Sequence, residues 1–125
     1  MKIAKKAPKR GQTTTIYGWG DMSAGEDLDV FSPFLQSLDR KVIATNRCKR
    51  IYKQTDNTKI VGKNITCTQA SLQFGACHGD SGGPLMKGGQ LVGLVSGGDP
   101  YCSGATPDLF VSLKQMRKWI NKQTR

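Results

Sequence analysis

The segment at residues 77–85 places one serine among three glycines and reads CHGDSGGPL. Glycine has no Cβ, so it allows backbone conformations and close approaches that other residues cannot adopt. A serine framed in this way can project its hydroxyl into a cleft while neighbouring N–H groups point at one spot. That arrangement suits a nucleophile with an oxyanion hole. On composition alone, however, a glycine-rich hairpin turn is the better interpretation.

Short apolar or β-branched runs separated by glycine and proline predict an all-β domain. The candidate strands are residues 13–17, 41–44, 84–86, 91–95 and 109–113, the third and fourth forming a hairpin. Two polar stretches are expected to be loops, residues 22–33 and 53–63. Short strands joined by such turns are typical of a sandwich or a barrel. The length of 125 residues is enough for one domain with its own core.

The C-terminus follows a helical pattern instead. Leu113, Met116, Trp119 and Ile120 recur at helical spacing, which predicts an amphipathic helix over about 113–122. Ser112 is the candidate N-cap. The apolar side chains of this helix are expected to dock on the barrel, and nothing in it points to catalysis.

The four cysteines are Cys48, Cys67, Cys77 and Cys102. An even number fits two disulfides in an oxidising compartment, and three pairings are open. Zinc binding is the competing interpretation. The sequence has no C-x-x-C pair and one histidine, His78, so we expect no metal. We expect no cofactor either.

The formal net charge is +10, and the basic residues fall in scattered groups at 2–10, 40–41, 47–53 and 117–125. Such groups can bind a polyanion or can simply be a solvated surface. The sequence favours the solvated surface and predicts no nucleic-acid partner, because it has no nucleic-acid motif. No apolar run approaches the roughly 18–20 residues of a membrane span. A basic N-terminus without a following apolar region shows no signal peptide.

Several segments resemble the trypsin/chymotrypsin family of serine proteases, whose Ser-His-Asp triad is well understood. The strongest is GDSGGP at 79–84, which matches the nucleophile motif of the family. The others are residues 18–20, 91–96, 106–107, 109–111 and 119–120. The resemblance covers the second half of the family fold. It implies that residues 13–125 form a six-stranded antiparallel Greek-key β-barrel that ends in a C-terminal α-helix. A basic interdomain segment at 1–12 would precede the barrel.

The resemblance assigns roles to the motif itself. Ser81 matches the nucleophile, and the backbone N–H groups of Gly79 and Ser81 match the oxyanion hole. Asp80 matches the aspartate that, in the family, pairs with the new N-terminal amine after zymogen cleavage. Ser96, Gly97 and Gly98 match the stretch that pairs with the substrate backbone. The family usually has tryptophan where this chain has Gly97, so a more open wall is expected.

The resemblance also describes a specificity pocket. Gly75 stands where trypsin-like relatives carry a floor aspartate, which disfavours an ordinary Arg/Lys pocket. Asp108 occupies a wall position that is usually glycine, and its carboxylate could meet a basic side chain from a different point. The alternative is that Asp108 faces solvent or pairs with a surface lysine. His78 matches a position at the pocket mouth, in contact with substrate.

By the same resemblance, Cys48 pairs with Cys67 and Cys77 pairs with Cys102. The implied location is extracellular, and the implied partners are a polypeptide substrate, protein inhibitors and the N-terminal barrel of the same protease. Asn64 opens an N-I-T sequon, a candidate glycosylation site if the chain is secreted.

The triad histidine and aspartate of the family come from the first barrel, for which these 125 residues have no room. We therefore expect this chain alone to be inactive. Three explanations stay open: a fragment of a secreted serine endopeptidase, one chain of a cleaved enzyme, or a truncated homologue that serves as a non-catalytic binding module. The first is the favoured hypothesis.

Overall fold

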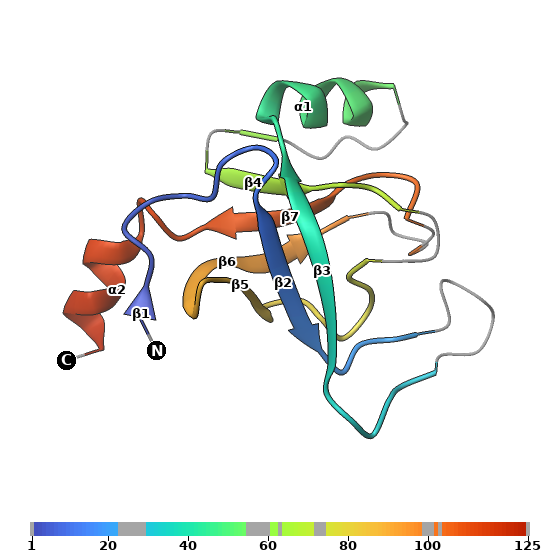
Figure 1. Ribbon diagram of the computed structural model, residues 1–125, viewed down its shortest axis with the longest axis horizontal. Helices are drawn as coiled ribbons and strands as arrows, with labels where there is room; N and C mark the ends of the chain where they lie inside the picture. The colour runs from blue at the N-terminus through green and yellow to red at the C-terminus, as the bar shows by residue number, and fades with distance from the viewer. Residues whose placement is uncertain are drawn as a thin grey trace.

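The computed structural model describes residues 2–22, 30–54, 61–62, 64–71, 75–98, 102 and 104–124 (Figure 1). It contains seven strands and two helices within those residues. The strands are β1 (Lys2–Ile3), β2 (Thr13–Gly18), β3 (Gln36–Ile43), β4 (Ile65–Thr68), β5 (Pro84–Lys87), β6 (Gln90–Gly97) and β7 (Asp108–Ser112). The helices are α1 (Thr45–Lys53) and α2 (Arg117–Gln123).

Strands β2 to β7 form a closed antiparallel barrel, as the resemblance implied. Their order around the sheet is β6-β5-β2-β3-β4-β7, and pairing of β7 with β6 closes the ring. Closure removes the open sheet edges on which other chains could pair. Strand β1 is added outside the ring and runs parallel to β6, with Lys2 opposite Gln90 and Ile3 opposite Leu91.

The hairpin of β5 and β6 forms where the sequence predicted it. Its turn residues Gly88 and Gly89 have φ angles of 57° and 75°. Both angles lie in the left-handed region, which glycine enters without a steric cost and which hairpin turns require. The pairing of β5 and β6 is irregular between Leu85 and Met86.

Alternating side chains of the strands point into the barrel and build the core. One cluster contains Ile16, Leu85, Val92, Val95 and Phe110, together with Ala4 from the N-terminal segment. A second cluster lies under α1, where the Cys48–Cys67 disulfide ties the helix to β4. Tyr52 of α1 is buried there, and its hydroxyl donates to the carbonyl of Pro107.

Several elements differ from the sequence prediction. Helix α1 and strand β4 were not expected, and β3 begins five residues before the predicted strand at 41–44. Helix α2 begins at Arg117 rather than near Leu113, because Ser112 is the last residue of β7. The apolar side chains of α2 are also less buried than expected, since Trp119 is 61% exposed.

Of the expected loops, residues 23–29 and 55–60 lie outside the described residues. Phe31 pairs with Asp21 as an isolated bridge. No helix among the described residues is long and apolar enough to cross a membrane.

Candidate functional site

The loop that carries Ser81 is fixed to the barrel by its own backbone. The N–H of Asp80 donates to the carbonyl of Cys77 at 2.9 Å, and the N–H of Gly83 donates to the carbonyl of Asp80 at 2.9 Å. The N–H of Gly82 donates to the carbonyl of Val95 on β6 at 2.8 Å, and the N–H of Val95 donates back to Gly83 at 2.9 Å. These bonds hold the serine beside the end of β6.

Among the described residues, three backbone N–H groups of this loop have no acceptor, those of His78, Gly79 and Ser81. Gly79 and Ser81 are the two that the resemblance assigns to the oxyanion hole. Both residues are exposed, so these donors are available to a ligand. Gly79 has a φ of 94°, a conformation that other residues rarely adopt. The N–H groups of Asp80 and Gly82, on either side of the exposed serine, bond within the fold.

The carboxylate of Asp80 turns away from the serine toward the segment after β2. Oδ1 accepts from the N–H of Gly20 at 2.8 Å, and Oδ2 accepts from the N–H of Cys77 at 2.9 Å. A Cβ on Gly18 or Gly20 would lie only 2.0 or 2.3 Å from this carboxylate group. These glycines make room for Asp80, which the sequence analysis did not recognise.

Asp80 also lines a hollow of about 320 Å³. Its other walls include Gly18, Asp21, Leu38 and Gly75, so it lies between the Ser81 loop and strands β2 and β3. Asp21 is 6% exposed; its N–H donates to the carbonyl of His78 at 2.8 Å, and its Oδ1 accepts from the N–H of Val30 at 2.9 Å. Asp21 thus supports the loop, a function that the sequence did not indicate.

Asp108 lies at the base of the Ser81 loop. It is 7% exposed, and its Oδ2 accepts from the N–H of Ala76 at 2.8 Å. Added Cβ atoms on Gly75 and Gly98 would lie 2.7 and 2.8 Å from its carboxylate oxygens. The side chain therefore lies between these two glycines, and the alternative in which it faces solvent is wrong.

Ser96 stands at an irregularity in the barrel. The pairing of β6 with β7 passes from Val95 opposite Phe110 to Gly97 opposite Leu109, so Ser96 is left out of the regular register. It is exposed, and Gly97 and Gly98 are half-buried. An irregularity of this kind re-aims side chains and frees backbone groups at the end of a strand.

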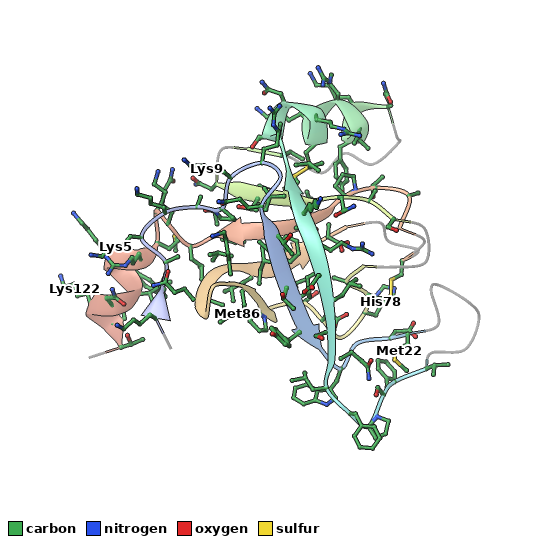
Figure 2. The ribbon with its side chains drawn as sticks, in the orientation of Figure 1. Lys5, Lys9, Met22, His78, Met86 and Lys122 are labelled. Atoms are coloured by element: carbon green, nitrogen blue, oxygen red, sulfur yellow. A yellow bond between two sulfur atoms is a disulfide. The ribbon has the colours of Figure 1, made fainter. Side chains whose placement is uncertain are left out.

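His78 is exposed on the turn before Gly79, on the opposite side of the molecule from Lys5 and Lys122 (Figure 2). Among the described residues, no group makes a hydrogen bond with the Ser81 hydroxyl, His78 included. The loop thus brings His78 close to Ser81 in the chain without giving the serine a base. The interpretation of His78 as a residue of the pocket mouth stays a prediction.

The Cys77–Cys102 disulfide forms as the resemblance implied and ties the Ser81 loop to the segment before β7. The Cys77, His78 and Cys102 side chains come within metal-binding distance of one another. Both sulfurs are shared in the disulfide, so neither is available as a thiolate ligand. Asn64, the sequon residue, is exposed just before β4.

Comparison with known proteins agrees with this geometry. The sequence matches the trypsin family profile over residues 2–120. It is 34% identical to trypsin iota of Drosophila melanogaster, with 98% of this chain and 46% of the relative covered. It is 30% identical to kallikrein-8 of Mus musculus, with 98% of this chain and 45% of the relative covered.

Among solved structures, the fold matches neuropsin, described as a serine protease expressed in the limbic system of mouse brain. The TM-score is 0.83 at 31% sequence identity, with 99% of this chain and 53% of neuropsin covered. The chain thus spans about half the length of the relatives it matches. The motif at 79–84, the closed barrel and the profile match together show that this chain belongs to the trypsin family of serine proteases.

Proposed function

We propose that this chain is the nucleophile-bearing half of a serine endopeptidase. The observation that carries the proposal concerns the N–H groups of Gly79 and of the exposed Ser81. Neither has an acceptor among the described residues, while the N–H groups of Asp80, Gly82 and Gly83 bond within the fold. Donors fixed in this way can stabilise the oxyanion that develops on a peptide carbonyl. The proposed substrate is accordingly a polypeptide.

In the proposed reaction the Ser81 Oγ attacks the carbonyl carbon of the scissile bond. Its proton passes to a histidine and then to the leaving amine, which leaves an acyl-enzyme that water hydrolyses. This sequence holds one histidine, His78, and its side chain makes no hydrogen bond to Ser81. We therefore place the catalytic histidine and its aspartate in an N-terminal barrel outside these 125 residues.

Exposed apolar side chains support such a partner. Phe31 and Phe34 are 54% and 75% exposed, and Trp19 is 57% exposed. Phe31 lies against the Ser81 loop, since a Cβ on Gly79 would come within 3.5 Å of its ring. Apolar surface gathered in this way is typical of an interface. The first barrel is the proposed occupant.

The hollow behind Asp80 suits an activation step. The Asp80 carboxylate accepts hydrogen bonds from two N–H donors and lines this hollow of about 320 Å³. A chain terminus that enters this space could pair its amine with Asp80, and the loop would then be fixed from behind. We assign Asp80 this role, as in the family pattern.

Substrate selection is assigned to Gly75, Asp108 and the stretch of Ser96, Gly97 and Gly98, in which Ser96 is exposed and the two glycines are half-buried. The buried Asp108 carboxylate lies between Gly75 and Gly98, so the pocket is shorter than one with two facing glycines. A carboxylate there favours a basic side chain but does not accept it in the usual trypsin manner. The proposed preference is mixed, with basic residues tolerated, and His78 contacts the substrate at the mouth.

Both disulfides favour an oxidising, extracellular location, where Asn64 would be a candidate for glycosylation and protein inhibitors could meet the site.

A second candidate function is a non-catalytic binding module of the same fold. It is favoured by the lack of a base beside Ser81 among the described residues. The two functions differ in whether Ser81 can be acylated.

Chemical rescue distinguishes them. The chain alone should not turn over ester substrates, and a fluorophosphonate should label it slowly. In that reaction Ser81 Oγ bonds to phosphorus, fluoride leaves and the proton needs a base. Added imidazole can supply that base, so labelling should rise at least tenfold and should be lost in Ser81→Ala but not in Ser37→Ala. Rapid labelling without imidazole would contradict the missing base, and no labelling with it would favour the binding module.

A further inference from the structure

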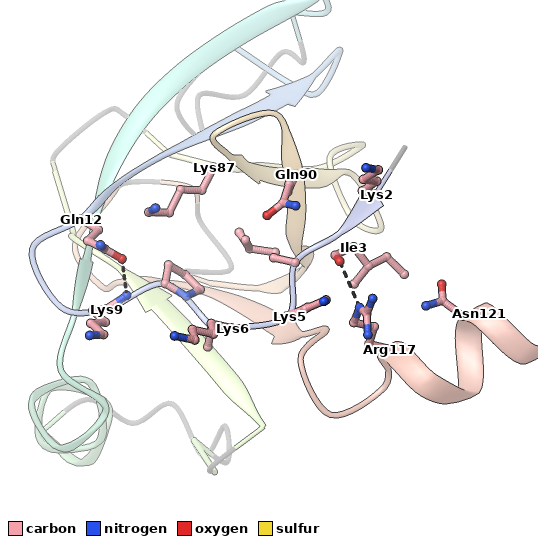
Figure 3. Close-up of a pocket in the computed structure, with 14 residues that line it drawn as sticks. Lys2, Ile3, Lys5, Lys6, Lys9, Gln12, Lys87, Gln90, Arg117 and Asn121 are labelled. Atoms are coloured by element: carbon pink, nitrogen blue, oxygen red, sulfur yellow. Dashed lines mark hydrogen bonds between the residues drawn. The ribbon is translucent and has the colours of Figure 1, made fainter.

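A hollow that lies far from the Ser81 loop is lined by cations. Its volume is about 850 Å³, and its walls come from the N-terminal segment, the β5–β6 hairpin and α2 (Figure 3). Six of its side chains are basic: Lys2, Lys5, Lys6, Lys9, Lys87 and Arg117. None of the described residues that line it is acidic. We call it the basic groove.

The segment that supplies four of these lysines is fixed to the barrel. Lys2 and Ile3 pair with β6, and the N–H of Ala4 donates to the carbonyl of Leu91 at 3.0 Å. Ala4 and Pro8 are buried, and Arg117 Nε donates to the carbonyl of Ile3 at 3.3 Å. The backbone under the lysines is therefore held in place, so a ligand would not have to order it.

The far end of the segment is fixed as well. The N–H of Gly11 donates to the carbonyl of Val42 at 2.8 Å, and the N–H of Val42 donates to the carbonyl of Gln12 at 3.0 Å. The N–H of Lys9 donates to Oε1 of Gln12 at 2.7 Å, which tightens this turn. The lysines are thus displayed between two anchored ends.

A second basic hollow adjoins the first across the same turn. Its volume is about 510 Å³, and Arg10, Lys41, Arg47 and Arg50 line it. Lys9 and Gln12 belong to the first hollow and Arg10 and Gly11 to the second, so the two meet at residues 9–12. Together they form what we call the basic track. Lys5 and Lys9 of the track lie on the side of the molecule away from His78 (Figure 2).

The charges of the basic groove are not balanced by acidic residues in the segments that line it. The chain has nine Asp and Glu residues, and none lies within residues 2–20, 81–98 or 109–125. Cations crowded at this density repel one another, and an anion that bridges them relieves the repulsion. In the sequence the basic residues fall in separate groups. The fold brings the N-terminal segment beside Lys87 and Arg117, which the sequence alone does not show.

We propose that the basic track binds a linear sulfated polysaccharide, at a site separate from the Ser81 loop. The elongated form of two joined hollows fits a chain of repeated anionic groups. Five of the six cations of the basic groove are lysines, and the compact ammonium of lysine can bind a sulfate in many orientations. Both disulfides place the chain where such glycans occur.

Other polyanions fit less well. Neither hollow has an aromatic side chain among its described lining residues, whereas single-stranded nucleic acids are gripped by stacking their bases on aromatic rings. A lipid surface would contact a flat face with exposed apolar side chains rather than two hollows. A sulfated glycan, by contrast, needs only closely spaced cations.

Binding of a fluorescent heparin octasaccharide to the 125-residue chain tests the proposal by anisotropy. The triple variant Lys5→Gln, Lys6→Gln, Lys9→Gln should weaken binding at least tenfold, and the slope of log Kd against log salt should fall by about 2. The matched control is Lys49→Gln, Lys53→Gln, Lys114→Gln, three exposed lysines outside both hollows. It removes the same charge and should weaken binding less than threefold.

A second variant guards against misfolding of the N-terminal segment. Lys87→Gln changes the opposite wall and should weaken binding two- to fourfold with an unchanged melting temperature. Equal losses in the track triple and in its control would overturn the proposal, because the whole surface would then bind by net charge. So would equal competition by a desulfated octasaccharide or by single-stranded DNA of equal charge.

Discussion

Asp108 and Ala76 join the barrel to the loop before Ser81, through a hydrogen bond from the Ala76 N–H to Oδ2 of Asp108 at 2.8 Å. Asp108 opens strand β7 and is 7% exposed, so its oxygen is fixed where it accepts this bond. The bond makes the same side chain a structural support and a candidate wall of the pocket. Two substitutions can separate these functions.

We expect Asp108→Ala to lower the free energy of unfolding by about 1–3 kcal/mol, because the Ala76 N–H loses its acceptor. Asp108→Asn keeps an oxygen that can accept and should cost less than Asp108→Ala. Urea denaturation measures both. Asp39→Ala is the control, since the Asp39 carboxylate bonds Thr15 at an exposed site, and it should change stability by less than about 0.5 kcal/mol. Equal losses for Asn and Ala would mean that the charge, not the hydrogen bond, provides the support.

Gly83 has no room for a side chain. A Cβ there would lie 2.8 Å from the carbonyl oxygen of Asp80 and 3.2 Å from that of Tyr17, both of them backbone atoms. We expect Gly83→Ala to destabilise the chain by about 1–3 kcal/mol, as overpacking does. Gly62→Ala is the matched control, because none of the described residues lies within 4 Å of its added Cβ. Thermal unfolding followed by circular dichroism compares the two, and equal melting temperatures would contradict the expected crowding.

The two disulfides should differ in what they protect. Closing loops of 19 and 25 residues gives about 3 kcal/mol each in the chain-entropy model, so removing either pair should lower stability similarly. Cys77→Ser with Cys102→Ser should also speed hydrogen exchange at Gly82 and Gly83, whose N–H bonds hold the Ser81 loop. Cys48→Ser with Cys67→Ser frees α1 from β4 and should leave those two amides protected. Exchange measured by NMR decides this, and the reverse pattern would show that the Ser81 loop does not depend on its own disulfide.

The exposed phenylalanines should drive self-association of the isolated chain. Phe31→Ser with Phe34→Ser removes two side chains that are 54% and 75% exposed, so folding stability should change little. Binding of a hydrophobic dye and the sedimentation-average mass should both fall. Trp119→Ser serves as the control, because Trp119 is 61% exposed on α2 and belongs to another surface. If this control lowers association equally, the apolar face beside Ser81 has no special part in it.

The sequence predicted the elements whose signals are local. The hairpin of β5 and β6 was recognisable because Gly88 and Gly89 form a turn between apolar runs. Helix α1 was missed because Thr45–Lys53 is mostly charged and polar, and its buried side chains are only Cys48 and Tyr52. The apolar residues of this helix, Cys48, Ile51 and Tyr52, do recur at helical spacing, but they are only three, so they are hard to distinguish in a stretch that is otherwise polar and basic.

The residues of the candidate site also differ in how local their sequence signals are. The motif at 79–84 identified Ser81 and Gly79 because its spacing is local. The environment of Asp80 could not be read, since Gly20 is 60 residues away in the chain and its N–H meets the carboxylate only after the barrel closes. The burial of Asp108 was likewise open until β7 took its place beside β4 and β6.

The hydrogen bonding of the Ser81 loop can be used in protein engineering. The N–H groups of Asp80, Gly82 and Gly83 bond within this chain, and those of Gly79 and Ser81 have no acceptor among the described residues, so the proposed oxyanion hole would be held by this chain alone. A base supplied by a separate polypeptide would then switch the pair on only when the two chains meet. Under the proposed function, the chain could thus serve as one half of a split reporter, in which turnover would show that two fused partner proteins had come together.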